Sequence, residues 1–445
     1  MIKLIISFNI VFFSVWTFFT SPEEKSKPIS DMPMCNTMQT DGINQWTGST
    51  YSSEFKSVKT APSVFLADST KTYTMPLLSQ TPKGDVMLSW TEKDEQGTTA
   101  FCLAFSKDKG KTFSEKKVIY AGTGVSNSRL MRAKVLAKKD GSLVAIFSNR
   151  TDAPQPATAQ TQGQPQGGRG GRGGGRASEL VYTVSKDGGN TWTSLQAVDT
   201  DPTKGLLRGF FDAVVLPNDE IAVAYLKDVK NSTKHEERDL RLAITKNGVF
   251  QAEKLLDAVV CDCCNINMLV DANGALNVIY RDNNDDIRDF SKMVSTNNGE
   301  TFSQPQNIYN DGWKIAGCPH NGAISSTHGK SALIAYYSGA ESESGVKLVT
   351  QDGKKLFVLD DPSVRNPDLM GSAQVSALVW EQGKDKTQLV FRTINKDKIS
   401  ETLSIEGSTN ATNSTGLIID NQLLIAHEVK QEHKNNSLKI ATTAL

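Results

Sequence analysis

The chain has 445 residues, of which 38% are apolar and 22% are charged, and these values are ordinary for a globular protein with a sizeable core. Its 49 acidic and 49 basic side chains cancel, so the protein has no overall electric field that would draw it to nucleic acid or anionic lipid. We therefore expect no nucleic-acid partner.

Residues 1–20 are predicted to be a signal peptide or an N-terminal anchor. Lys3 is followed by an apolar run over Leu4–Phe19, which is short for a membrane span and typical of a secretory h-region. No small-residue cleavage pattern follows, so cleavage and retention both stay open. We expect an exported protein that is periplasmic, on the cell surface or secreted, and that touches a membrane only through an uncleaved segment 1–20. The even number of cysteines, six, makes disulfides the default expectation for an exported chain.

A hairpin pattern recurs seven times in the remainder of the chain. A copy consists of an apolar strand, a turn rich in Gly, Asp or Asn, and a second strand that ends near a large side chain, and the sixth copy, Val375–Glu381, has lost its turn. These large side chains, called anchors below, are Trp90, Phe147, Tyr225, Tyr280, Tyr336, Trp380 and His427. The anchors are 44–57 residues apart, except for 78 residues between Phe147 and Tyr225, and this spacing is typical of propeller blades. The pattern predicts an all-β fold, a β-propeller with seven blades, with six blades as the alternative.

Three turns that follow the third strand of a repeat share one composition. Ser106–Phe113 and Ser185–Trp192 read Ser-x-Asp-x-Gly-x-Thr-aromatic, and Ser295–Phe302 has Asn297 in place of the Asp. The Asp or Asn is expected to accept hydrogen bonds from turn amides, and the Gly to adopt a positive φ. We interpret these turns as structural devices.

The chain is predicted to divide into residues 1–20, an N-terminal segment 21–60 and the propeller 61–445. The second and third hairpins are separated by a Gly- and Arg-rich insertion, 152–178, whose core has nothing to bury and is expected to be a disordered loop. The last hairpin lacks a fourth strand, so a strand from residues 45–66 is expected to close the ring and remove its sheet edges.

The seven hairpins with these turns resemble the Asp-box proteins, the sialidase-like β-propellers. The resemblance implies the fold over roughly residues 60–445. For an active sialidase it implies three arginines that hold a carboxylate, a tyrosine nucleophile with a glutamate, and an acidic proton donor. Thr74 stands in Tyr73–Pro76 where that family has its first arginine. Tyr336 and Tyr337 are candidates for the phenol, and no glutamate partner is identifiable by motif. The resemblance therefore carries the fold and not the activity.

A cysteine-rich stretch carries the most unusual chemistry of the chain. With Tyr280–Asp282 and Gly312–Pro319, its Cys-x-Cys-Cys segment is similar to a group of exported bacterial propellers that are labelled sialidase-like from fold alone. In a propeller, segments 261–264, 281–289 and 311–322 belong to loops that open on one face. We expect them to converge at the mouth between the fourth and fifth blades.

The four cysteines of these loops, Cys261, Cys263, Cys264 and Cys318, allow two interpretations. Two disulfides are favoured for an exported protein. The alternative is a soft-metal site of three or four thiolates, with His320 as a further ligand, that would bind copper or zinc. No other cofactor is predicted.

Seven side chains of the same loops are predicted to bind a small-molecule or glycan ligand. They are Arg281, Asp282, Arg288, Asp289, Trp313, His320 and Asn321. A pair of arginines suits a carboxylate or a sulfate, and an indole can stack on a sugar ring. The alternative is an ion-pair network that ties the loop down.

These observations lead to three hypotheses about function. The first is an exported propeller that binds a small anionic ligand, a glycan or a metal at the mouth of its fourth and fifth blades, without sialidase activity. The alternative is an exo-acting, sialidase-like glycoside hydrolase with a diverged clamp of Arg281 and Arg288, completed by Arg208 or Arg132. The second alternative is a copper-handling or redox protein. No catalytic residue is assigned.

Overall fold

The computed structural model describes residues 55–61, 64–150, 178–230, 237–396, 398–431 and 435–445. All regular elements in these ranges are strands, and none of them contains a helix that is long and apolar enough to cross a membrane. The predicted signal segment 1–20, most of the segment 21–60 and nearly all of the insertion 152–178 lie outside the described residues.

The first four sheets follow one another along the chain. Sheet 1 contains β3 (Lys71–Gln80), β4 (Val86–Asp94), β5 (Thr99–Ser106) and β6 (Lys117–Gly122). Sheet 2 contains β7 (Val125–Ser126), β8 (Lys134–Ala137), β9 (Leu143–Arg150), β10 (Ser178–Ser185) and β11 (Gln196–Ala197). Sheet 3 contains β12 (Arg208–Val215), β13 (Ile221–Asp228), β14 (Arg238–Lys246), β15 (Val249–Phe250) and β16 (Lys254–Val260). Sheet 4 contains β17 (Asn267–Val270), β18 (Leu276–Arg281), β19 (Phe290–Ser295) and β20 (Gln306–Asn307).

Three further sheets complete the described part of the chain. Sheet 5 contains β21 (Ile324–His328), β22 (Ser331–Ser338), β23 (Gly345–Thr350) and β24 (Lys355–Leu359). Sheet 6 contains β25 (Arg365–Gly371), β26 (Ser376–Gln382), β27 (Gln388–Asn395), β28 (Lys398–Ile399), β29 (Leu403–Ile405) and β1 (Lys56–Val58). Sheet 7 contains β30 (Ala411–Ile419), β31 (Gln422–Val429), β32 (Ser437–Ala444) and β2 (Val64–Leu66).

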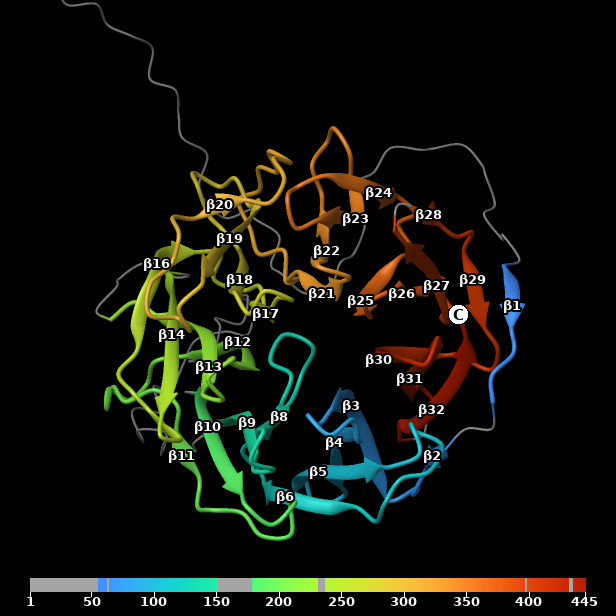
Figure 1. Cartoon of the computed structure of the whole chain (residues 1–445), viewed down its shortest axis with the longest axis horizontal. Helices are drawn as coiled ribbons and strands as arrows, with labels where there is room; N and C mark the ends of the chain where they lie inside the picture. The colour runs from blue at the N-terminus through green and yellow to red at the C-terminus, as the bar shows by residue number, and fades with distance from the viewer. Residues whose placement is uncertain (1–54, 62–63, 151–177, 231–236, 397, 432–434) are drawn as a thin grey trace, which may run out of the picture. The chain divides into compact units, whose positions relative to one another are not determined.

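The seven sheets are arranged as blades around a common axis (Figure 1). The first strand of each sheet lies nearest the axis, and first strands of neighbouring sheets contact one another from β12 through β17, β21, β25 and β30 to β3. The prediction of an all-β, seven-bladed propeller is therefore confirmed, and the alternative of six blades is wrong.

Two short strands that precede sheet 1 in the chain lie on the last two sheets. β2 pairs antiparallel with β32, where Leu66 faces Leu438, and supplies the fourth strand of sheet 7. β1 runs parallel to β29 at the rim of sheet 6. Strands from the beginning of the propeller thus cover edges of its end.

The core of the propeller lies between neighbouring sheets. The anchors Trp90, Phe147, Tyr225, Tyr280, Tyr336, Trp380 and His427 are all buried. One cluster joins sheets 3 and 4, and another joins sheets 2 and 3. His427 is the polar exception among the anchors, and burial lowers the pKa of its imidazole to about 4. Hydrophobic packing between sheets therefore holds the ring together.

The turns with shared composition are closed by side-chain hydrogen bonds. Asp108 accepts from the Ser106 hydroxyl at 2.8 Å and from the Thr112 amide at 2.9 Å, and Ser106 accepts from the Gly110 amide at 2.8 Å. The turn after β10 has the same pattern. Hydrogen bonds from Thr112 lower the pKa of Asp108 to about 2. These residues fix the turn, as their sequence indicates.

The first strands of sheets 1, 3, 6 and 7 share a bulge opposite the anchor. In sheet 1, Thr74 pairs with Thr91 and Leu77 pairs with Ser89, so three steps of β3 face two steps of β4. The same offset occurs in the other three sheets. One residue in each bulge has a positive φ, namely Met75 (52°), Phe210 (53°), Asn366 (49°) and Asn413 (51°). A bulge bends the strand and redirects side chains at that point.

Sheet 2 carries a longer insertion at the same place. Ser126 pairs with Ser148, and Lys134 pairs with Ile146, on either side of the anchor position. Residues 127–133, called the sheet 2 expansion below, lie between these pairs and extend toward the axis (Figure 1).

Sheet 4 has an insertion in the equivalent position. The Cys261 amide donates to the Arg281 carbonyl at 3.1 Å, and Asn267 pairs with Ile279. Residues 262–266 lie between these contacts. With Cys261 they form what we call the sheet 4 expansion, residues 261–266. The two unusual loops of this propeller are therefore enlargements of one recurring structural element.

Candidate functional site

The three loops predicted to converge do meet between sheets 4 and 5. The Arg281 guanidinium donates to the Asn321 side chain at 2.5 Å. The Cys318 thiol lies 3.5 Å from the Asp262 carboxylate. These contacts join residues that are 40 and 56 positions apart in the chain. The fold therefore brings into contact side chains from loops that are far apart in the sequence.

Arg281 is a buried connector of these loops, with 2% of its surface exposed. Its Nη1 donates to the Arg288 carbonyl at 2.6 Å, and its Nη2 donates to the Tyr337 carbonyl at 2.8 Å. Its guanidinium carbon lies 4.1 Å from the Phe290 ring centroid and 4.9 Å from that of Trp313. Both of its terminal nitrogens are thus engaged by the protein itself.

The acidic partners of the predicted arginine pair cap backbone amides. Asp289 accepts from the amides of Gly312 and Trp313 at 2.9 and 3.1 Å. Asp282 accepts from the Asn283 amide at 2.8 Å. Arg288 is buried, and its Nη2 lies 3.6 Å from Asp286. Asp282 and Asp289 thus hold their loops through backbone amides.

Trp313, His320 and Asn321 complete the set of predicted ligand-binding residues. Trp313 is buried and packs edge-on against Tyr337, with ring centroids 5.6 Å apart. Asn321 is half-buried, and His320 is exposed with a φ of 52°. Among the seven predicted residues, only His320 presents a largely accessible side chain. A ligand role for this group stays a prediction.

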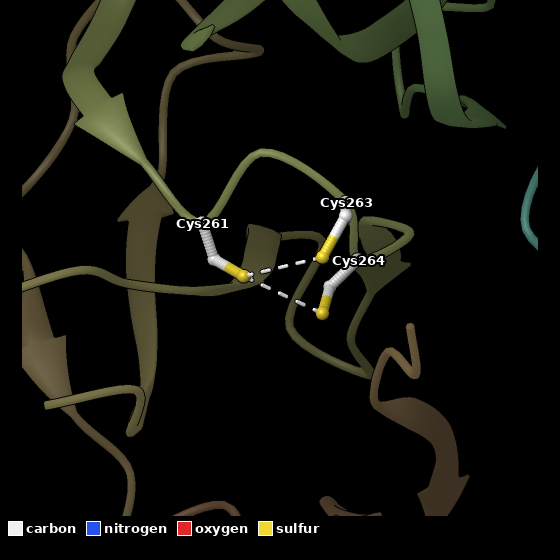
Figure 2. A group of neighbouring side chains, drawn as sticks. All are labelled: Cys261, Cys263 and Cys264. Atoms are coloured by element: carbon white, nitrogen blue, oxygen red, sulfur yellow. Dashed lines mark hydrogen bonds between the residues drawn. The ribbon is translucent and has the colours of Figure 1, made fainter. Parts of the chain in front are cut away.

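The cysteines form a compact group in which three thiols are buried. Cys261 Sγ lies 3.9 Å from Cys263 Sγ and 3.5 Å from Cys264 Sγ, and Figure 2 shows the three side chains pointing toward one another. The ligand atoms of Cys263, Cys318 and His320 also lie within 4.8 Å of one another. All four cysteines are free thiols in the structure.

The thiols of this group differ in their acidity. Hydrogen bonds from Cys263 and Cys264 lower the pKa of Cys261. Burial raises the pKa of Cys264 to about 12. Cys102, in contrast, lies alone in β5 within the core of sheet 1, where burial raises its pKa to about 12. The cluster therefore favours one thiolate, which its neighbours stabilise.

A second group of charged residues lies at the axis. It combines Arg129 and Arg132 of the sheet 2 expansion with Asp368 of β25 and Glu428 of β31. Arg129 Nη2 donates to the Pro367 carbonyl at 3.1 Å. Arg132 Nη2 is buried and has no hydrogen-bond partner among the described residues. We call these four charged side chains the axial cluster.

Burial and mutual charge shift the acidity of the axial cluster. Burial raises the pKa of Asp368, and the charges of Arg132 and Arg129 oppose that shift. Burial also raises the pKa of Glu428. The pKa of Arg129 is lowered to about 10, by burial and by the neighbouring charge of Arg132. The axial cluster therefore combines two arginines with two acids, and the pKa values of the two acids are raised.

The bulges of neighbouring strands hold the carboxylates of this region. Glu428 accepts from the Met75 amide at 2.8 Å and from the Asn413 side chain at 2.9 Å. Glu381 accepts from the Asn413 amide at 2.8 Å. Glu381, Glu428 and Arg281 each follow an anchor in the sequence. That position is the signal that could have identified Glu428, whereas Arg129 and Asp368 have no such signal.

Three residues considered for hydrolysis have structural partners. The Thr74 hydroxyl lies 2.9 Å from that of Thr91, so no cation replaces the missing arginine there. Arg208 is buried and pairs with Asp199. Tyr336 donates to Asp311 at 2.9 Å, and burial raises the pKa of its phenol. Arg208 and Tyr336 are therefore unsuited to the clamp and nucleophile roles that the sequence left open for them.

Comparisons with known proteins agree with this architecture. No family profile matches the chain, and no curated protein matches it in sequence. A solved structure of a Dyadobacter fermentans protein of unknown function is similar with a TM-score of 0.51 and 11% identity, over 87% of this chain and 99% of that one. An ulvan lyase bound to -[GlcA(1-4)Rha3S]- is similar with a TM-score of 0.50 and 12% identity, over 86% and 96% of the two chains.

Sialidases are also among the similar structures. The intramolecular trans-sialidase from Ruminococcus gnavus has a TM-score of 0.45 and 12% identity, over 86% of this chain and 96% of that one. At these identities the likeness concerns the fold alone. The chain is a seven-bladed β-propeller in architecture, and its function has to be argued from its own side chains.

Proposed function

We propose that this protein binds an acidic carbohydrate at the axial end of its propeller, through Arg129 and Arg132. The sequence-based hypothesis of a small anionic ligand is kept, but its cations are reassigned. Arg281 is occupied by backbone carbonyls and Asn321. It therefore acts as a support of the neighbouring loops.

The observation that carries the proposal is the Arg132 guanidinium. Its Nη2 lacks a partner among the described residues, although a buried donor without a hydrogen bond is costly. Arg132 lies close enough to Arg129 for its positive charge to lower the pKa of Arg129. Two adjacent cations are stabilised by an anion, and a planar guanidinium suits a carboxylate or a sulfate. A carboxylate or sulfate ligand would accept a hydrogen bond from Arg132 Nη2 and would offset the repulsion between the two arginines.

The ligand class is supported by shape and by analogy. The mouths of propellers are common ligand sites. The ulvan lyase of similar fold is bound to a sugar that contains GlcA. That likeness is one of fold, so we use it to choose the first ligands for testing.

Calorimetry with matched sugars tests the proposal. We expect the full chain to bind oligosaccharides containing glucuronate, and to bind the corresponding methyl esters or neutral sugars much more weakly. Arg132→Gln should weaken binding of the acidic sugar by about 10- to 100-fold, or ~1.4–3 kcal/mol, the value of a charge-assisted hydrogen bond. Arg365→Gln is the control because Arg365 is exposed on β25 and lies outside the axial cluster. Equal binding of acidic and neutral sugars would contradict the proposal.

A glycoside hydrolase is the second candidate, and one observation favours it. The acids Asp368 and Glu428 both have raised pKa values, mainly because of burial. A raised pKa favours the protonated form of a carboxyl group, and a general acid needs that form. A fluorogenic sialoside or glucuronide should then be cleaved by the full chain and not by Asp368→Asn. Binding without cleavage would leave only the first candidate.

A further inference from the structure

The thiol group of sheets 4 and 5 is a second centre, distinct from the axial cluster. Three of its members come from the sheet 4 expansion, in which five residues separate Cys261 from the strand residue Asn267. The exposed fractions of Cys261, Cys263 and Cys264 are only 1%, 3% and 2%. A ligand that reaches them would be almost fully enclosed by protein.

The spacing of the sulfur atoms suits a bound metal ion. Zinc–thiolate bonds of ≈ 2.3 Å place sulfur atoms about 3.8 Å apart in a tetrahedral site and about 4.0 Å apart in a trigonal one. Cys261 Sγ lies 3.5 Å from Cys264 Sγ and 3.9 Å from Cys263 Sγ. All three sulfurs lie within 4.8 Å of one another, so a small inward movement would place them at the corners of a coordination polyhedron (Figure 2).

A second triad lies beside the first and shares one residue with it. The ligand atoms of Cys263, Cys318 and His320 are within 4.8 Å of one another. Cys318 is half-buried and His320 is exposed, so this triad leads from the buried sulfurs toward the surface. It offers two thiolates, which are soft ligands, and one imidazole, which is a borderline ligand, and copper and zinc both accept these ligand types.

The surrounding residues keep the two triads in place. Cys318 Sγ lies 3.5 Å from the carboxylate of Asp262, which is itself buried. Arg238 Nη1 lies 3.9 Å from the same carboxylate. The Cys261 amide is fixed to the Arg281 carbonyl at 3.1 Å. These contacts hold Cys318 and Cys261 in position.

We propose that Cys261, Cys263 and Cys264 bind one thiophilic metal ion, Cu(I) or Zn(II), and that Cys318 and His320 form its surface-side entry. The shared residue Cys263 passes the ion from the outer triad to the inner one. No redox change is needed, since each thiol only releases its proton as it binds the metal. This centre is independent of carbohydrate binding at the axis.

Metal titration of the reduced full chain tests this proposal. The protein is purified under reductant, stripped with a chelator, and titrated anaerobically with Zn(II) or Cu(I) in competition with a chromogenic chelator. We expect one ion per chain. Co(II), used as a spectroscopic probe, should give a thiolate-to-cobalt charge-transfer band.

Four variants separate the roles of the ligands. Cys263→Ser should weaken binding by more than about 100-fold, beyond the effect of losing a supporting residue. Cys318→Ser and His320→Ala should keep the stoichiometry and slow the loading of the metal. Cys102→Ala is the matched control because Cys102 is buried in β5, away from the cluster. It should bind like the unchanged chain.

Several outcomes would overturn the proposal. One is the absence of stoichiometric binding by the reduced chain for both metals. Another is a Cys263→Ser variant that loads as the Cys102→Ala control does. If Cys263→Ser fails to fold, unchanged loading rates in both Cys318→Ser and His320→Ala would contradict the entry route. Mass spectrometry that finds two disulfides in the purified chain, with no metal binding after reduction, would restore the disulfide interpretation.

Discussion

The sheet 2 and sheet 4 expansions occupy equivalent positions in their sheets. They differ in whether the terminal nitrogens of their arginines have hydrogen-bond partners. Both replace the bulge opposite the anchor of their sheet. The sheet 4 expansion is held by Arg281, whose two terminal nitrogens are both bonded. The sheet 2 expansion contains Arg132, whose Nη2 has no hydrogen-bond partner in the described part of the chain.

The difference teaches where to look for a ligand in this fold. An arginine that is stacked on aromatic rings and bonded to carbonyls stabilises the structure, whatever its conspicuous sequence neighbours suggest. Arg132, held beside Arg129, leaves a terminal nitrogen without a hydrogen bond among the described residues, whereas the atom of Arg281 without one is its Nε. A terminal nitrogen of a guanidinium can bond a carboxylate or a sulfate. At the sheet 4 expansion, the capacity to bind a ligand belongs to the thiols.

The largest expected effect is that of Arg281→Ala. The change leaves the acceptors of Arg288, Asn321 and Tyr337 without their donor. At about 1–3 kcal/mol for each unsatisfied buried group, we expect a loss of about 3–5 kcal/mol in the free energy of unfolding. Arg132→Ala should cost less than about 1 kcal/mol, since Nη2 has no hydrogen bond to lose. Urea unfolding of both variants measures the contrast. Equal losses would break the comparison between the two expansions.

A smaller effect is expected at the acidic side of the axial cluster. Burial raises the pKa of Asp368 above its ordinary value of 3.8, so the folded protein binds this proton more tightly than the unfolded chain. The ionised group therefore lowers stability as the pH rises above 3.8. Asp368→Asn should be more stable than the unchanged chain at pH 7, and this gain should disappear below pH 3.8.

Melting temperatures between pH 3.5 and pH 7, without sugar, measure this difference. The control is Asp360→Asn, a change of an exposed acid in the segment that precedes β25. A gain for Asp368→Asn that is independent of pH would mean that its charge is not the cause. Such a result would also weaken the case for Asp368 as a general acid.

The sequence predicts what is local and repeated in this fold. The seven anchors mark the second strands because each hairpin carries its own turn and its own buried side chain. Cys261 and Cys263 are conspicuous because thiols are rare, so their loop could be identified as unusual. Arg129, Asp368 and Glu428 could not be grouped in this way, since they meet only after the ring closes. The bulges were equally hidden, because their register depends on the partner strand.

The smallest expected effect concerns the turn after β5, which serves as a reference for both expansions. Asp108→Asn mimics the natural turn at Asn297. There the side-chain oxygen of Asn297 accepts from the backbone amide of Thr301 at 3.0 Å, and its side-chain nitrogen donates to the Thr301 hydroxyl at 2.9 Å. The pKa of Asp108 is lowered to about 2, mainly by hydrogen bonds from Thr112, so its charge stabilises the fold above pH 3.8 and less as the pH falls toward 2. We expect a small drop in the urea midpoint at pH 7 that shrinks at pH 3, with sugar and metal binding unchanged. A change in sugar or metal binding by this variant would show that the turns and the expansions are coupled through the blade. The axial cluster and the thiol group could then no longer be treated as local sites.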